Sequence, residues 1–110
     1  MKITKENIKE AMEKKLVICN NKGFHIKLKN GWTISVQFGV GNYCENYDND
    51  IIEFRDIGKF PYASDTAEIW AWNSGKHYPE DPLGYQTPEQ ILKFINKISK
   101  KKNEKTKMQA

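Results

Sequence analysis

Long apolar runs, cysteine and histidine are all scarce in this chain of 110 residues. No stretch approaches the roughly 18 consecutive apolar residues that a membrane-spanning helix needs, so we expect no membrane contact. Residues 1–15 carry no apolar segment of the kind that a secretory signal contains. These two absences together predict a cytosolic protein.

The two cysteines and two histidines do not form a metal-binding pattern. Cys19 and Cys44 make no Cys-x-x-Cys pair, and His25 and His77 are far apart in the sequence. Because there is no sign of export, we expect two reduced and largely buried thiols. A disulfide is the alternative, since the strand pairing predicted below brings the two segments near each other.

Signatures of catalysis and of nucleotide binding are lacking as well. The pair Gly39 and Gly41 has no third glycine and no helix start after it, which favours a turn over a phosphate-binding loop. Asp48 and Asp50 lack the glycine and the terminal glutamate of a calcium loop. No nucleophile stands at a suitable spacing from a base. We therefore predict a protein that is not an enzyme and binds no cofactor.

Charge is present but is unevenly distributed. Residues 93–110 hold seven lysines and one glutamate and therefore carry a charge of +6. Since the whole chain carries +4, residues 1–92 carry −2. Residues 44–56 are locally acidic, with five carboxylates against Arg55. The basic character therefore belongs to the C-terminus rather than to the whole surface.

The clearest structural pattern is a β-hairpin over residues 24–43. Apolar and polar residues alternate in both strands, which is typical of strands with one buried face. A three-residue loop, Lys29–Gly31, pairs Phe24 with Val36 and Ile26 with Ile34, whereas a two-residue Asn-Gly turn would mix apolar and polar side chains on both faces. We predict the three-residue loop, with Gly31 in the left-handed conformation.

The other elements follow from caps and periodicity. A first helix is expected over residues 5–14 with Thr4 as its N-cap, and residues 16–19 are either its end or a small strand. Strands are expected at 51–54 and 66–73, residues 73–75 form a turn, a short strand begins at 76–78, and Pro79–Gly84 forms a connection. A capping box predicts a last helix that begins at Pro88 and ends near Lys100.

These elements predict an α+β fold. The small antiparallel sheet has about four or five strands, and the N-terminal and C-terminal helices pack on one of its faces. The domain covers residues 1–100, and the basic residues 101–110 form a disordered tail.

The most suggestive surface feature is the pair Trp70 and Trp72. If Ala67, Ile69 and Ala71 face the helices, both indoles stand on the opposite face of the sheet, where exposed aromatic rings commonly contact partner proteins. The alternative is that the indoles point inward and belong to the core. The candidate binding residues are Trp70, Trp72, Gln37, Tyr43, Tyr78, Asp48 and Asp50.

Three segments resemble small uncharacterised proteins encoded by bacteriophages and prophages. They are GWTISVQFGVGNYCEN at 31–46, TAEIWAWNSGKHY at 66–78 and LGYQTPEQILKFI at 83–95. The shared motifs are a turn, strands and a helix cap, and the resemblance supplies no catalytic residues. It implies a phage-borne accessory protein in the cytoplasm of the host cell, which binds a bacterial protein, defence systems included, and modulates or inhibits it.

Two further functions are compatible with the sequence. One is a nucleic-acid-binding accessory protein, whose contacts would come from Lys100, Lys101, Lys102 and Lys105. The other is a small-molecule (nucleotide) binder or sequestering protein, in which Tyr43, Trp70, Trp72 and Tyr78 line a pocket. The sequence does not determine the oligomeric state.

Overall fold

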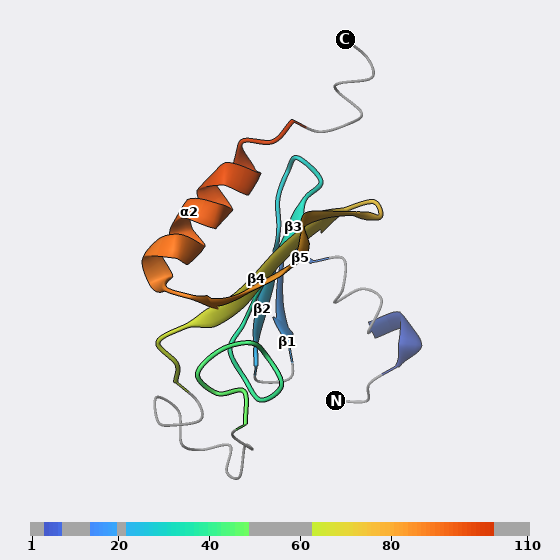
Figure 1. Cartoon of the computed structure of the whole chain (residues 1–110). Coiled ribbons are helices and arrows are strands. Elements are labelled where there is room, and N and C mark those ends of the chain that lie inside the picture. Colours follow the sequence, from blue (N-terminus) through green and yellow to red (C-terminus); the bar gives the residue numbers. More distant parts are fainter. Residues whose placement is uncertain (1–3, 8–13, 20–21, 49–62, 103–110) are drawn as a thin grey trace.

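The computed structural model describes residues 4–7, 14–19, 22–48 and 63–102. Its elements are β1 (Leu16–Cys19), β2 (Gly23–Lys27), β3 (Thr33–Gln37), β4 (Ala67–Asn73), β5 (Lys76–Gln86) and α2 (Pro88–Ser99). The five strands form one antiparallel sheet in the order β1-β2-β3-β4-β5, and α2 lies across one of its faces (Figure 1). The predicted α+β class, with a small antiparallel sheet and a C-terminal helix, is confirmed.

The register of the β2–β3 hairpin is the one that burial of the apolar face predicts. Phe24 pairs with Val36, and Ile26 pairs with Ile34. The Gly31 amide donates to the Leu28 carbonyl (3.1 Å), and Gly31 has a φ of +89°. The three-residue loop and its left-handed glycine are therefore confirmed.

The side chain of Asn30 connects the tip of this hairpin to the end of α2. Its Nδ2 donates to the main-chain oxygens of Ile98 (2.9 Å) and Lys101 (2.8 Å), and its Oδ1 accepts from the Trp32 amide (3.1 Å). The last carbonyls of a helix have no partner within the helix. Asn30 therefore contacts one carbonyl of the last helical turn, that of Ile98, and the Lys101 carbonyl just beyond the helix, and so connects the hairpin to the end of α2.

The core lies between α2 and strands β3 and β4. Ala67, Ile69 and Ala71 point toward α2 and are at most 2% exposed. The two alanines have small side chains, which allows the helix to approach the sheet closely. The core also contains Trp32, Ile34, Val36, Phe94 and Ile98.

α2 begins as predicted. The Gln90 amide donates to Thr87 Oγ1 (3.3 Å), and Gln90 Oε1 accepts from the Thr87 amide (2.8 Å), so the capping box is complete. The helix ends at Ser99 with Lys100 as its C-cap.

Two predictions about β5 are wrong. The turn that precedes it has two residues rather than three, because Asn73 pairs with Lys76, while Ser74 (φ +48°) and Gly75 (φ +86°) form the loop. Two successive residues with positive φ are typical of a type I′ hairpin turn. The strand also continues beyond residue 78 to Gln86, with irregular register opposite β4. Its prolines are tolerated because β5 is the last strand of the sheet order, and proline is compatible with an edge strand.

The N-terminal prediction is only partly correct. Within the described residues the first helix is confined to residues 5–7, where the Asn7 amide donates to Thr4 Oγ1 (3.1 Å) as a cap would require. Residues 4–7 are exposed, so no packing of this helix on the sheet is seen there. Lys14 and Lys15 form a bend rather than a helix end. Residues 16–19 form β1, because β-branched Val17 and Ile18 favour a strand that pairs with β2.

Other predictions fall outside the described residues. They are the centre of the first helix (8–13), the strand at 51–54, Asp50, Lys105 and the last part of the tail (103–110). The two cysteines are not paired in a disulfide. Cys19 and Cys44 are both free thiols, with Cys44 buried and Cys19 half-buried.

Candidate docking face of the sheet

The two faces of the sheet have different surroundings. Side chains alternate along a strand, so the three buried β4 residues that face α2 place Trp70 and Trp72 on the opposite face. Both indoles are half-buried, and no helix of the described residues covers them. Of the two orientations that the sequence left open, the structure has the one in which Ala67, Ile69 and Ala71 face α2.

The two indoles form one continuous row with two histidine rings. The His77 imidazole stacks on Trp70, with ring centroids 4.3 Å apart and 8° between the planes. Trp72 lies edge-on to Trp70 (6.1 Å, 65°), and His25 lies edge-on to Trp72 (5.1 Å, 86°). We refer to His25, Trp70, Trp72 and His77 as the indole–imidazole array.

The array crosses β3, whose residues on this face are small. Thr33 pairs with Trp72 and Ser35 with Trp70. Their exposed fractions are 9% and 7%, although neither of the helical segments that the structure describes lies on this face. Large rings on the neighbouring strands β2 and β4 account for that burial, because cross-strand neighbours stand only about 5 Å apart. The array is thus a solid layer over the middle of the sheet.

The indole of Trp70 is also held by a hydrogen bond. Its Nε1 donates to the Pro79 carbonyl of β5 (2.7 Å). Stacking on one side and a donor bond at the edge give this ring a fixed position. The ring of Trp72 has no such bond among the described residues, which leaves its N–H available as a donor to a ligand.

The electrostatics at His25 favour a neutral ring. Burial lowers the pKa of His25 below its usual value, because an imidazolium loses solvation there, and the charge of nearby Lys27 lowers it further. His25 is therefore neutral at neutral pH. The centre of this face is aromatic, His25 adds no charge to it, and Lys27 lies beside it.

Gln37 and Glu68 form the polar end of the same face. Gln37 Nε2 donates to Ser35 Oγ (3.0 Å), and Asn42 Nδ2 donates to Gln37 Oε1 (3.4 Å). Glu68 accepts from the Tyr43 amide (3.2 Å). Gln37, a predicted binding residue, therefore lies beside the array but uses its side chain within the fold.

Tyr43 belongs to an anchored loop at residues 39–48. Asn46 is fully buried, and its Nδ2 donates to the carbonyls of Phe38 (2.9 Å) and Ala63 (3.0 Å). The Tyr43 ring stacks on Tyr47 (5.4 Å, 10°), and both rings are exposed. Asp48 is exposed near the end of this loop.

Tyr78 is on the other face. It pairs with Ala71, stacks on Phe94 (6.1 Å, 18°) and accepts a hydrogen bond from the Lys97 ammonium group. That hydrogen bond lowers the pKa of the Tyr78 hydroxyl. The sheet therefore separates Tyr78 from the two indoles, so the pocket of the small-molecule hypothesis is not formed by these residues.

The lysines at the end of α2 have different roles. Lys101 is half-buried, and its ammonium group lies over the rings of Trp32 (5.2 Å) and Tyr78 (4.8 Å). Contacts of this kind between a cation and a ring are stabilising. Lys101 therefore stabilises the fold. Of the lysines proposed to contact nucleic acid, Lys100 and Lys102 are exposed to solvent.

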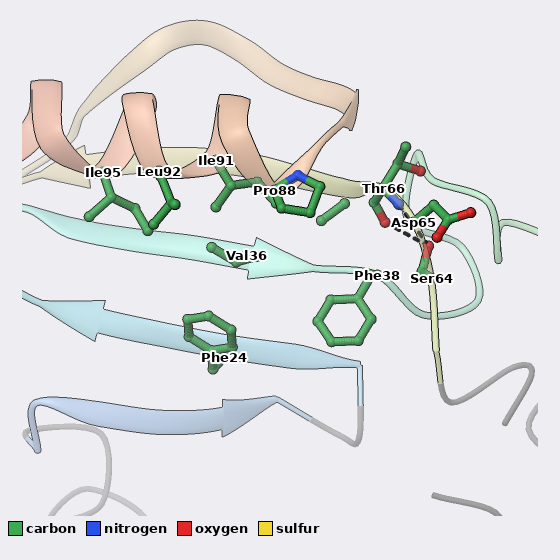
Figure 2. Close-up of a pocket in the computed structure, with 11 residues that line it drawn as sticks. Phe24, Val36, Phe38, Ser64, Asp65, Thr66, Pro88, Ile91, Leu92 and Ile95 are labelled. Carbon is green, nitrogen blue, oxygen red and sulfur yellow. Dashed lines mark hydrogen bonds between the residues drawn. The ribbon is translucent and has the colours of Figure 1, made fainter. Parts of the chain in front are cut away.

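An apolar groove beside α2 was not predicted from the sequence. It has a volume of about 390 Å³ and lies between the helix and strands β2 and β3 (Figure 2). Phe24, Phe38, Ile91 and Ile95 are among the residues that line it. A helix about 10 Å wide covers two strands spaced about 4.8 Å apart, so α2 alone leaves the apolar face of β1 and β2 open. The sequence predicts that both helices cover this face, and such a packing would leave no groove.

Comparison of the chain with protein-family models, with curated proteins and with solved structures gives no match. In the part of the chain that the structure describes, no three His, Cys, Asp or Glu side chains are grouped so that they could hold a metal ion. None of the helices described there has the length and apolar character needed to cross a membrane.

Proposed function

We propose that this chain is a non-enzymatic binding protein, encoded by a bacteriophage or prophage, that docks on a bacterial host protein and modulates or inhibits it. The observation that carries the proposal is the indole–imidazole array, a row of rings on the sheet face opposite α2 in which His77 is exposed and the other three are half-buried. The host cytoplasm is the proposed compartment, and defence systems are the target class that the resemblance to phage proteins implies.

The composition of the array supports docking on a protein. Tryptophan is among the residues that contribute most to protein–protein affinity, and such residues cluster at the centre of interfaces. Both indoles here are partly accessible and adjacent. Neutral rings at the centre also avoid the cost of removing a charge from water.

The rigidity of the array is a second supporting feature. Binding requires side chains at an interface to lose rotational freedom, which costs about 0.5–1.5 kcal/mol for each one that becomes ordered. Trp70 is already fixed by His77 and by the Pro79 carbonyl. A partner that covers this ring therefore loses little affinity to ordering it.

The surroundings of the array supply polar contacts. Lys27 lies at one end, and Glu68 and Gln37 lie at the other. An aromatic centre with a polar periphery is the usual anatomy of a specific interface. The opposite charges at the two ends would fix the orientation of a partner.

The test is capture of bacterial proteins from a lysate, followed by a footprint on the purified complex. We expect the double variant Trp70→Ala/Trp72→Ala to lose the captured protein. A matched control, Leu92→Ala, removes an exposed apolar side chain from α2 and should retain it. Circular dichroism and thermal melting establish that the variants are folded.

A second measurement needs no variant and compares the wild-type protein before and after it binds the captured partner. The captured partner should protect Trp70 and Trp72 from acrylamide quenching, whereas Trp32, which is only 7% exposed, contributes little signal. If a folded double variant captures the same partner, or if the complex leaves both indoles as accessible as before, docking through this face is wrong.

A further inference from the structure

We propose that the outer edge of β1 is a second docking site, separate from the indole–imidazole array, which accepts an extended apolar segment with acidic flanks from a partner protein as a sixth strand. The observations that lead to this inference are the direction of the β1 main chain, the exposure of its side chains, the difference between the two sheet edges and the distribution of charge.

The main-chain groups of Leu16 and Ile18 point away from the sheet. The Lys27 amide donates to the Lys15 carbonyl (2.8 Å), so Lys15 directs its polar groups toward β2. The direction alternates along an antiparallel strand, so Val17 and Cys19 also face β2 while Leu16 and Ile18 face outward. Each outward residue offers one donor and one acceptor at the spacing that another strand requires.

The side chains of the same two residues are exposed. Leu16 is 70% and Ile18 is 81% exposed, although both are large and aliphatic. They share the face of their β2 partners Ile26 and Phe24. Since Phe24 lines the groove beside α2, the apolar surface extends from this groove to the sheet edge. An added strand would cover Leu16 and Ile18 with its own apolar residues.

The opposite edge of the sheet is protected. β5 contains Pro79 and Pro82, adjacent carboxylates at Glu80 and Asp81, and irregular register opposite β4. Its Tyr85 amide already donates to the Tyr43 carbonyl of the 39–48 loop (2.8 Å). Prolines, charges, bulges and covering loops are the devices that prevent an edge from pairing with other chains. β1 itself contains neither proline nor a charged residue.

The charge around β1 defines the chemistry of the partner. Residues 14–44, which contain β1, β2 and β3, include five lysines and no aspartate or glutamate. Lys14 and Lys15 directly precede the strand and are exposed. An apolar segment with glutamate or aspartate at its ends would pair with these lysines, whereas a second copy of β1 would place like charges near one another. Strand addition with pockets for alternate side chains is an established mode of peptide recognition.

The test uses a fluorescent peptide of alternating valine and threonine with glutamates at both ends, and a matched peptide with lysines in place of the glutamates. We expect the acidic peptide to bind the full-length protein and to weaken as salt is raised, while the lysine peptide does not bind. In hydrogen exchange followed by NMR, the Leu16 and Ile18 amides should become protected about tenfold or more on binding.

The specific variant is Ile18→Pro, which removes an outward N–H and leaves the donors that face β2 in place. We expect it to weaken the acidic peptide about tenfold or more. The control Leu83→Lys alters an exposed aliphatic residue on β5 and should bind as the wild type does. Should Ile18→Pro fail to fold, the exchange pattern of the wild-type protein decides the question.

Three outcomes would overturn the inference. They are equal binding of both peptides, unchanged binding by a folded Ile18→Pro variant, and a peptide that leaves the Leu16 and Ile18 amides unprotected. Concentration-dependent dimerisation that Ile18→Pro abolishes would identify a second copy as the occupant and would also contradict the proposed partner. Failure of the proposed array function would leave the β1 proposal standing. The array residues are on β2, β4 and β5, and they are tested with other variants.

Discussion

The imidazole of His77 lies parallel to the indole of Trp70, with 4.3 Å between the ring centroids and 8° between the planes. The pair depends on the two-residue turn at Ser74 and Gly75, which sets His77 opposite Trp72 and on the face of the indoles. The length of this turn therefore determines which ring joins the array: two residues place His77 beside the indoles, and three would place Tyr78 there.

Replacing His77 by alanine should make Trp70 more accessible. The substitution removes the stacked ring and leaves the hydrogen bond to Pro79 in place. We expect acrylamide quenching of Trp70 to increase and the free energy of unfolding to fall by about 0.5–1 kcal/mol. The control His77→Phe retains a stacked ring and should resemble the wild type. Equal quenching in the wild type and the alanine variant would show that the stack does not shield the indole.

Replacing Gly31 by valine should destabilise the β2–β3 hairpin. Gly31 has a φ of +89°, and an added Cβ would stand 3.2 Å from the Asn73 side-chain nitrogen. A β-branched residue in the left-handed region costs about 1–3 kcal/mol, which lowers the melting temperature by about 4–8 °C per kcal/mol in a domain of this size. Gly31→Asn should cost less, since asparagine tolerates this conformation. An unchanged melting temperature for Gly31→Val would contradict the turn.

Replacing Asn30 by alanine should loosen the end of α2. The variant loses the donor bonds to the Ile98 carbonyl in the last turn of α2 and to the Lys101 carbonyl beyond it, and one acceptor bond within the hairpin loop. We expect the free energy of unfolding in urea to fall by about 1–3 kcal/mol. Lys29→Ala, at the exposed neighbouring position, is the control and should change stability little. Faster hydrogen exchange at the end of α2 in Asn30→Ala alone would confirm where the loss occurs.

The pH dependence of stability should reveal His25. Its pKa is lower in the folded protein than the usual value of 6.5, so the unfolded chain binds a proton first as the pH falls. The contribution of His25 is therefore complete above pH 6.5 and is lost as the pH falls from there toward the folded-state pKa. We expect His25→Gln to flatten the stability profile in this range. The same slope in both proteins would mean that the imidazole is not desolvated.

The parts of the fold that the sequence predicts are those in which burial permits one arrangement. The register of Phe24 and Ile26 follows from the need to keep apolar side chains on one face, and the start of α2 follows from Thr87 and Gln90. The sequence left the orientation of Trp70 and Trp72 open between an exposed face and the core, and the small side chains of Ala67 and Ala71 supported the exposed one.

The remaining parts depend on tertiary context. Prolines at 79 and 82 indicate a connection, and only the position of β5 at the edge of the sheet allows the strand to continue through them. His77 could not be assigned to the array, because the two possible turn lengths place opposite side chains on each face. The groove beside α2 depends on how many strands one helix covers, which local patterns do not specify.

The contrast between the two borders of the sheet has a consequence for stoichiometry. Growth of a fibre by strand addition requires two free sheet edges in every subunit. One edge pairs with the preceding subunit, and the other stays free to pair with the next. Here β5 is obstructed by its prolines, its bulges and the contact with the 39–48 loop. We therefore expect the proposed association through β1 to end after a single addition, which would give a finite pair rather than a polymer.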